Sequence, residues 1–168
     1  MTSPLAFLVV DDDVFLRRAS QSLLKSFTAL PVLDAADGHA GLALLETQHV
    51  DIVFCDLSMP EMDGLAFLRH LGEAGHQASV VVVSSHDDAL ISSVEKMAHA
   101  YGVALLRALK KPLTREKIAE VIEQHEKRLA KGARRAAEMP SFDLADMLRG
   151  MQAGEFTAFY QPQIDFRT

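Results

Sequence analysis

The chain has 168 residues, of which 49% are hydrophobic and 24% are charged, and its formal net charge is −6. This composition is typical of a globular domain with a packed core, and the length leaves room for about one domain and an appendage. The acidic balance argues against a nucleic-acid partner, because proteins that bind the phosphate backbone usually carry a basic face.

Strands and helices are predicted to alternate along the first 130 residues. Short apolar or β-branched runs bounded by turn residues predict buried strands over residues 5–10, 32–35, 52–55, 79–83 and 104–109. Apolar residues at helical spacing predict helices over residues 14–27, 40–46, 65–71, 88–101 and from Thr114 to about residue 130. Five strands alternating with five helices predict an α/β fold with a doubly wound, five-stranded parallel sheet.

The pattern changes after residue 130. The apolar stripe of the last helix runs from Ile118 to Leu129 and then fades, so residues 131–140 are predicted to be a linker or the end of a protruding helix. This stripe also suggests a homodimer formed through the last helix. The pattern of residues 141–168 predicts one helix, followed by one strand over about residues 156–166. One helix and one strand cannot form a core alone. We therefore expect them to be a fragment of a second domain.

The cellular compartment is indicated by the absence of targeting signals and by the cysteine content. The first residues carry no basic segment, and the apolar runs are too short for a signal core or a membrane span. We expect a cytoplasmic location and no membrane association. The single cysteine, Cys55, agrees with a reducing compartment, and its place in an apolar run predicts core packing.

Four of the predicted strands are followed by polar residues that together could bind a phosphate. Asp11 and Asp12 follow the first strand, Asp56 the third, Ser84 the fourth and Lys111 the fifth. The carboxyl ends of parallel strands converge at one edge of a sheet, so we expect the Lys111 ammonium within about 10 Å of Asp56, a screening length. Three carboxylates repel one another unless a divalent cation lies among them. The sequence therefore predicts a Mg²⁺ site with Asp11, Asp12 and Asp56 as ligands.

Asp56 is the predicted reacting group of this pocket. A carboxylate oxygen can attack a phosphoryl group and form an acyl phosphate, and a metal ion neutralises the charge that opposes the attack. The backbone carbonyl of Ser58, just past Asp56, is a further candidate oxygen ligand. Lys111 would pair with the phosphoryl oxygens, and Ser84 would donate its hydroxyl to them only in the phosphorylated form. The Lys111–Pro112 peptide bond is a candidate cis bond.

Each of these segments also has a structural interpretation when it is taken alone. Residues 11–13 could cap a helix, Asp56 could cap a loop, and Ser84-Ser85 could form a turn at a strand end. Lys110-Lys111 could be a solvated pair. Their joint occurrence at the ends of four strands of one fold favours the functional interpretation.

These segments resemble the receiver domain of two-component response regulators over about residues 4–130. The motifs are residues 8–13, 51–64 and 83–85 and Lys111-Pro112. The resemblance implies a flavodoxin-like fold that accepts a phosphoryl group from a sensor histidine kinase or phosphotransfer protein and is not itself an enzyme. It assigns the site residues as follows: Asp56 as phosphoacceptor, Asp12 as direct metal ligand, Asp11 as a ligand through water, Ser58 as carbonyl ligand, Ser84 as switch hydroxyl and Lys111 as phosphate-pairing lysine.

Two positions depart from this family's pattern. Receivers usually carry Tyr or Phe three residues before the conserved lysine, and this chain has Ala108 there. Ser84-Ser85 replaces the commoner Thr-Ala or Ser-Ala pair. We expect phosphorylation to survive both changes, whereas the signal would leave the pocket through a helix shift or a dimer rearrangement rather than through ring rotation.

Residues 141–168 are similar to the start of an EAL-type cyclic di-GMP phosphodiesterase domain. The resemblance rests on Gly154-Glu155-Phe156 and Tyr160-Gln161-Pro162. It implies that Gln161 belongs to a nucleotide pocket and that the Glu-Ala-Leu motif would lie beyond Thr168. The structural alternative for Tyr160-Gln161-Pro162 is an edge strand whose proline blocks pairing.

The favoured hypothesis is a receiver that, when phosphorylated on Asp56, regulates an attached cyclic di-GMP phosphodiesterase. The alternative is a receiver that acts as a dimerisation or binding module, with a degenerate EAL effector that senses cyclic di-GMP or a protein. A magnesium phosphohydrolase with Asp56 as nucleophile is a more distant alternative. Such enzymes normally carry a second aspartate two residues later, where this chain has Ser58.

Overall fold

The computed structural model describes residues 4–85, 88–138 and Arg149. The chain divides into two compact units, Met1–Leu129 and Ala130–Thr168. The elements, in chain order, are β1 Phe7–Val10, α1 Val14–Leu24, β2 Leu33–Ala35, α2 Gly38–Thr47, β3 Ile52–Asp56, α3 Gly64–Glu73, β4 Ser79–Ser84, α4 Asp88–Ala100, β5 Leu105–Lys110 and α5 Arg115–Glu138. All neighbouring strands pair in parallel, in the order β2-β1-β3-β4-β5. The predicted doubly wound α/β fold is confirmed.

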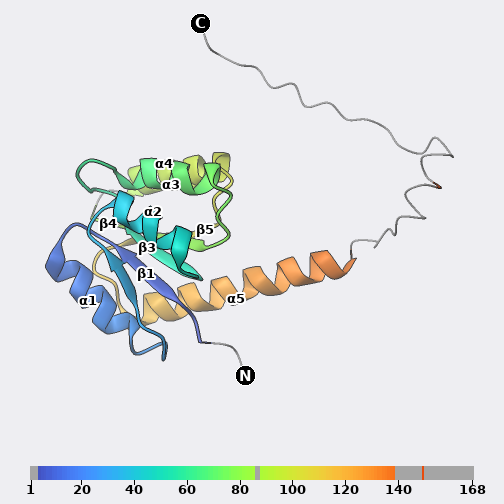
Figure 1. Cartoon of the computed structure of the whole chain (residues 1–168), viewed down its shortest axis with the longest axis horizontal. Helices are drawn as coiled ribbons and strands as arrows, with labels where there is room; N and C mark the ends of the chain where they lie inside the picture. The colour runs from blue at the N-terminus through green and yellow to red at the C-terminus, as the bar shows by residue number, and fades with distance from the viewer. Residues whose placement is uncertain (1–3, 86–87, 139–148, 150–168) are drawn as a thin grey trace, which may run out of the picture. The chain divides into compact units, whose positions relative to one another are not determined.

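Helices cover both faces of this sheet, with α2, α3 and α4 on one side and α1 and α5 on the other (Figure 1). Alternate residues of a strand point to opposite faces. In β3, Val53 and Cys55 enter the core beneath α2, α3 and α4, whereas Ile52 and Phe54 enter the core beneath α1 and α5. A strand buried on both faces needs an apolar residue at nearly every position, which explains the continuous runs in the sequence. Cys55 is fully buried, as predicted, and burial raises the pKa of its thiol.

Aspartates begin three of the helices. Asp13 Oδ1 accepts hydrogen bonds from the backbone N–H groups of Phe15 and Leu16, at 2.8 and 3.0 Å. Asp37 and Asp63 cap α2 and α3 in the same way. A cap of this kind stabilises a helix by about 1 kcal/mol. The cap at Asp37 starts α2 at Gly38, two residues before the predicted start. In the acidic run after β1, Asp13 therefore has the structural role of a helix cap.

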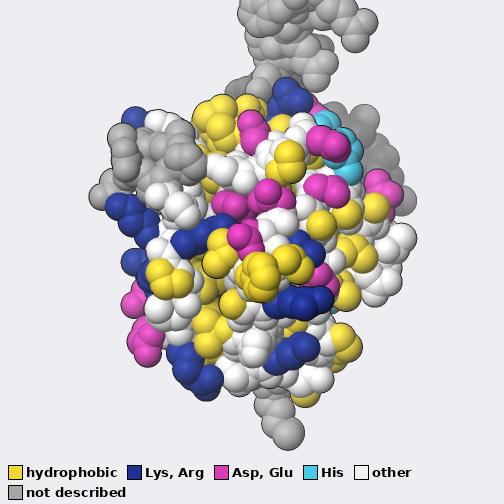
Figure 2. All heavy atoms as spheres, turned by 90° about the vertical axis from the view of Figure 1, so that its left-hand side faces the viewer, with side chains coloured by type: hydrophobic (Ala, Val, Ile, Leu, Met, Phe, Trp, Pro, Cys, Tyr) yellow, Lys and Arg dark blue, Asp and Glu magenta, His cyan; other side chains and the backbone are white. Residues whose placement is uncertain are grey.

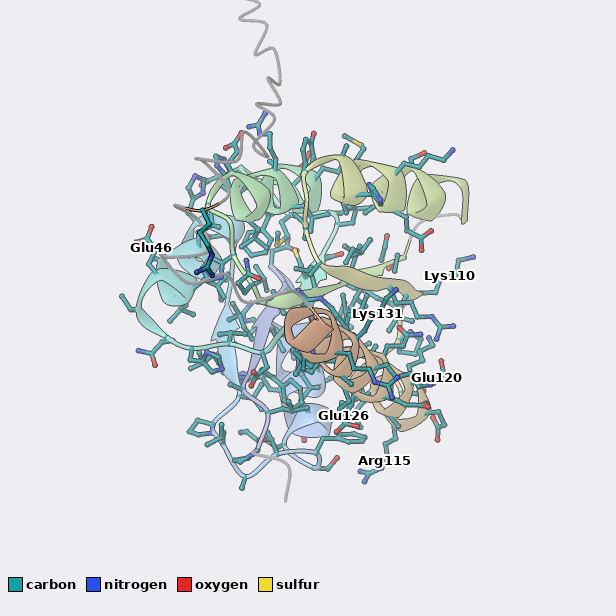
Figure 3. All side chains as sticks on the ribbon, turned by 90° about the vertical axis from the view of Figure 1, so that its right-hand side faces the viewer. Glu46, Lys110, Arg115, Glu120, Glu126 and Lys131 are labelled. Carbon is teal, nitrogen blue, oxygen red and sulfur yellow. The ribbon has the colours of Figure 1, made fainter. Side chains whose placement is uncertain are left out.

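The last helix continues past residue 130 and runs to Glu138. Its apolar stripe packs against the sheet through Ile118 and Val121, which are fully buried, whereas Leu129 is 52% exposed. Arg115 and Glu120 are exposed on this helix (Figure 3). Glu120 forms an ion pair with Arg107 of β5, and Arg115 donates a hydrogen bond to the Ser26 hydroxyl. None of the described helices is both long enough and apolar enough to cross a membrane.

The predictions for the second domain fall mostly outside the described residues. The helix after Ser141, the strand over residues 156–166 and the position of Gln161 lie there. Within the predicted linker, residues 131–138 are the end of α5. This part of the stretch is therefore helical, and the boundaries of the linker and of the second domain stay a prediction.

Candidate functional site

The carboxyl ends of β1, β3 and β5 place a lysine between two aspartates. Lys111 Nζ lies 2.9 Å from Asp11 Oδ2 and 2.9 Å from Asp56 Oδ2. Asp11 is only 5% exposed and Asp56 only 8%. In the sheet, β4 separates β3 from β5, so the long lysine side chain reaches across the end of β4. The expected approach of Lys111 to Asp56 is thus met by a direct hydrogen bond.

Asp12 adds a third carboxylate to this pair. Oxygen atoms of Asp11, Asp12 and Asp56 all lie within 4.8 Å of one another, and Asp12 is the exposed member. A site built only of carboxylate oxygens suits a hard divalent cation such as Mg²⁺. Figure 2 shows acidic side chains gathered in the middle of the face where the strands end, beside a group of hydrophobic side chains.

The loop after β3 folds back over Asp56. The backbone N–H of Ser58 donates to Asp56 Oδ1 at 3.3 Å, and the N–H of Gly64 donates to the carbonyl of Leu57 at 2.9 Å. A Cβ atom at Gly64 would lie 2.6 Å from the Asp56 carbonyl oxygen, so only glycine fits there. The loop therefore keeps Ser58 beside the carboxylate. Its carbonyl as a metal ligand stays a prediction.

Ser84 ends β4 and is fully buried. Its carbonyl accepts a hydrogen bond from the backbone N–H of Lys111 at 2.9 Å, which ties the end of β4 to the lysine. The Lys111–Pro112 peptide bond is cis, as predicted. The role of the Ser84 hydroxyl as a switch stays a prediction.

A family model described as the response regulator receiver domain matches residues 7–123. This chain belongs to that family. Over 160 residues it is 39% identical to the cyclic di-GMP phosphodiesterase RocR of Pseudomonas aeruginosa, an alignment that covers 94% of this chain and 40% of the relative. Over 138 residues it is 34% identical to the transcriptional regulatory protein ZraR of Salmonella typhimurium, covering 82% of this chain and 29% of that protein. The chain thus spans less than half the length of either relative.

Solved structures of receiver domains share this fold. The CheX–CheY–BeF₃–Mg²⁺ complex of Borrelia burgdorferi contains a chain that matches with a TM-score of 0.62 and 28% identity, over 71% of this chain and 87% of that one. The receiver domain from Clostridium thermocellum matches with a TM-score of 0.63 and 24% identity, over 75% and 97%. Receiver domains generally bind Mg²⁺ at an acidic pocket, and this receiver has such a cluster of aspartates.

The electrostatics of this receiver's pocket favour a cation. Burial raises the pKa of Asp11, and the hydrogen bond and charge of Lys111 offset this only in part. Burial by itself would lower the pKa of Lys111, but hydrogen bonds and charges from Asp11 and Asp56 outweigh it, so that pKa lies above its ordinary value. The lysine stays protonated, yet one ammonium faces three carboxylates. A divalent cation would neutralise the remaining negative charge.

The position of the usual aromatic switch in this receiver is taken by a small residue on an edge strand. Ala108 lies opposite Val82 of β4 and is partly buried against the core beneath α4. Its methyl group cannot make the inward rotation that a ring makes. The route of the signal through a helix shift or a dimer rearrangement stays a prediction.

Arg17 of the receiver contacts the site and Asp34 holds Arg17, and neither residue was predicted from the sequence. Arg17 of α1 donates hydrogen bonds to the backbone at Asp11 and Asp12 and forms an ion pair with Asp34 of β2. The available signals were weak: an arginine one turn into the first helix and an acid inside a short strand. Only the pairing of β1 with β2 brings the two together.

Proposed function

We propose that this receiver accepts a phosphoryl group on Asp56 and that Asp11, Asp12 and Asp56 hold the Mg²⁺ ion that the reaction needs. The observation that carries the proposal is the paired contact of Lys111 with Asp11 and Asp56 at the edge of a three-carboxylate cluster. An ammonium held among carboxylates is poised to bind the oxygens of an incoming phosphoryl group.

The chemistry is a transfer between an imidazole and a carboxylate. An Asp56 oxygen attacks the phosphorus of a phosphohistidine, the P–N bond breaks, and its electron pair leaves with the imidazole, which takes up a proton. Lys111 then pairs with a phosphoryl oxygen, and Ser84 donates its hydroxyl to another. Bound Mg²⁺ supplies the charge neutralisation between two anionic reactants, and the Ser58 carbonyl is its further ligand.

The same residues argue against a hydrolase. A magnesium phosphohydrolase with Asp56 as nucleophile would need an acidic residue two positions later to protonate its leaving group. This chain has Ser58 there, which carries no carboxyl group. The domain is therefore proposed to be a phosphoacceptor whose donor is a sensor histidine kinase or a phosphotransfer protein.

We further propose that the attached effector is an EAL-type cyclic di-GMP phosphodiesterase. In this proposal residues 1–130 are the receiver, 131–140 the linker and 141–168 the start of the effector. The alignment with RocR supports it, because 94% coverage of this chain must extend well past residue 123, where the receiver match ends. The helix α5, which continues to Glu138, supplies a connection through which phosphorylation could act on the effector.

The second candidate is a receiver that works as a binding or dimerisation module with a degenerate effector. The observation in its favour is Leu129, which is 52% exposed at the end of the apolar stripe of α5. A full-length protein that binds cyclic di-GMP without hydrolysing it would support this candidate. A Leu129→Ala variant that dimerises as strongly as the wild type would oppose it.

The decisive experiment is phosphorylation of the purified chain by acetyl phosphate with Mg²⁺, followed by intact mass. Asp56→Asn should lower labelling at least about 100-fold, because it removes the nucleophile. Asp51→Asn is the matched control, since it makes the same charge change at the other end of β3. Equal labelling of Asp56→Asn and wild type would refute the assignment.

The effector requires a separate experiment. The 168-residue chain is expected not to hydrolyse cyclic di-GMP, because it would hold only the start of the proposed effector. A longer chain that contains the whole effector should hydrolyse it at a rate that changes when Asp56 is phosphorylated. A rate identical with and without phosphorylation would contradict the regulatory part of the proposal.

A further inference from the structure

Helix α1 carries an arginine that bonds the main chain beside the metal site. Arg17 Nη1 donates to the Asp11 carbonyl at 2.7 Å and to the Asp12 carbonyl at 3.4 Å. Its Nε donates to Asp34 Oδ2 at 2.9 Å. The side chain is only 14% exposed. One guanidinium therefore connects β2 with the turn that carries two of the candidate metal ligands.

Asp34 is itself held in place from the same helix. Gln21 lies one turn after Arg17 and donates through Nε2 to Asp34 Oδ1 at 3.0 Å and to the carbonyl of Val32 at 3.1 Å. Asp34 thus uses one oxygen for Arg17 and the other for Gln21. A planar guanidinium fixed by a carboxylate loses little further freedom when it forms additional hydrogen bonds.

The two carbonyls lie where the regular pairing of β1 ends. β1 ends at Val10, and α1 begins only at Val14. Between them, the Asp11 N–H still donates to the Ala35 carbonyl of β2 at 3.2 Å, and the Asp13 N–H donates to Asp11 Oδ1 at 2.9 Å. Arg17 is the described donor to the carbonyls of Asp11 and Asp12. The charged donor binds the Asp11 carbonyl closely and the Asp12 carbonyl at longer range. It therefore helps to fix these two peptide groups and, with them, the directions in which the Asp11 and Asp12 side chains leave the backbone.

The contact geometry also fits the electrostatics of a metal site. The hydrogen bonds of Arg17 go to main-chain oxygens and to Asp34. The guanidinium therefore places positive charge beside the aspartates without using the carboxylate oxygens that a cation would bind. Lys111, in contrast, bonds those oxygens directly.

We propose that Arg17 is a positioning residue of the metal site, which aims Asp11 and Asp12 through their backbone, and that Asp34 holds Arg17 in the orientation needed. This inference rests on the proposed Mg²⁺-dependent phosphorylation of Asp56. Arg17 acts on the affinity for the ion, and it touches neither the phosphoryl group nor Asp56.

The test is a calorimetric Mg²⁺ titration of the 168-residue chain and its variants. Arg17→Gln should weaken Mg²⁺ binding about 10-fold, the lower end of the loss seen when a group that orients a metal ligand is removed. Arg17→Lys should recover only part, because an ammonium cannot hold Asp34 and both carbonyls in one plane. Arg18→Gln is the control: it makes the same charge change at the next, exposed position of α1.

Asp34→Asn tests the second half of the proposal with the arginine still present. It should weaken Mg²⁺ binding less than Arg17→Gln, and the double variant should be no weaker than Arg17→Gln alone, because both act through one contact. At low Mg²⁺ concentration, labelling by acetyl phosphate should be slower in Arg17→Gln and Asp34→Asn than in wild type, and rising Mg²⁺ should bring it back toward the wild-type limiting rate. A purely structural role would lower that limiting rate as well. Arg18→Gln should match wild type at every Mg²⁺ concentration.

Three results would decide against the positioning role. Equal weakening by Arg17→Gln and Arg18→Gln would reduce the effect to net charge. Additive losses of Mg²⁺ affinity in the double variant would show that Asp34 does not act through Arg17. If Arg17→Gln does not fold, an unchanged Mg²⁺ affinity of Asp34→Asn would also contradict the proposal. Failure of the wild-type chain to bind Mg²⁺ would instead refute the proposed function.

Discussion

Two aspartates flank strand β3, and they have opposite surroundings. Asp51, just before the strand, accepts the backbone N–H of Ala6 through Oδ2 at 2.8 Å and contacts His49 through Oδ1 at 3.1 Å. Asp56, the last residue of the strand, shares Lys111 with Asp11 and lies beside Asp12. At the amino end one carboxylate has two hydrogen-bond partners, whereas at the carboxyl end three carboxylates lie around one lysine.

The difference shows how one sheet separates stability from binding. At the amino end, Ser79 begins β4 and its hydroxyl contacts Nδ1 of the buried His125 at 2.8 Å while accepting from Arg128 at 3.1 Å. These contacts hold α5 to the sheet. At the carboxyl end, repulsion among carboxylates lowers the free energy of unfolding, and a bound cation would raise it again. We therefore expect repulsion between carboxylates to lower stability at the carboxyl end of the sheet and not at its amino end.

Removing Lys111 should have the largest effect on this comparison. In Lys111→Met, Asp11 and Asp56 lose their only described cationic partner. Without Mg²⁺ the free energy of unfolding should fall by about 3 kcal/mol, the cost of leaving a buried charge unpaired. Urea unfolding with and without Mg²⁺ measures it, and Mg²⁺ should restore part of the loss.

The control for this variant is Lys110→Met, which makes the same change in an exposed side chain (Figure 3). It should change the free energy of unfolding by less than about 0.5 kcal/mol. Equal losses in the two variants would mean that the carboxyl end is no more strained than ordinary surface, and the contrast between the two ends would disappear.

A pair of glycines on α3 tests both ends of the sheet at once. A Cβ at Gly64 would lie 2.6 Å from the Asp56 carbonyl oxygen, and one at Gly72 would lie 2.2 Å from the Tyr101 carbonyl oxygen. Each alanine variant should lose about 2 kcal/mol of unfolding free energy through overpacking against backbone. Only Gly64→Ala should also weaken Mg²⁺ binding and slow labelling, because only that backbone carries Asp56. Impaired labelling in Gly72→Ala would contradict this separation.

The smallest effect concerns His125 and pH. Burial lowers the pKa of His125; Asp51 and Glu126 oppose the shift, and Arg128 adds to it. The folded protein therefore binds fewer protons than the unfolded chain once the pH falls below the ordinary imidazole pKa of about 6.5. Stability from this group is fully present above that pH and is lost below it, at up to about 1.4 kcal/mol per pH unit for one proton.

Urea unfolding between pH 7.5 and 5 measures this slope. His125→Gln should flatten it whatever its effect on absolute stability, because glutamine does not titrate. If the variant has the same slope as wild type, His125 is not the group that makes the unfolding free energy depend on pH in this range.

The fold followed from the sequence because each of its elements has a local signal. Strands buried on both faces must be continuously apolar, and the helices between them show one apolar stripe each. Two helix boundaries differ from the prediction. The cap at Asp37 starts α2 two residues earlier, and α1 ends at Leu24 because N–H groups just beyond it bond to carbonyls three residues back.

The candidate site was predictable for a related reason. In a parallel sheet every strand end arrives at the same edge, so Asp11, Asp56 and Lys111 could be placed together from their positions after apolar runs. What the sequence alone determined is therefore the set of residues at that edge and the chemistry of their side chains.

Only the tertiary structure decided how those residues are supported. Arg17 reaches Asp34 because β2 lies beside β1, Gly64 is required because the loop after β3 turns back on Asp56, and His125 is buried because α5 crosses the start of β4. No periodic pattern or motif in the sequence predicts these contacts. They depend on which elements become neighbours, and that is settled by packing across the sheet rather than by the order of residues along the chain.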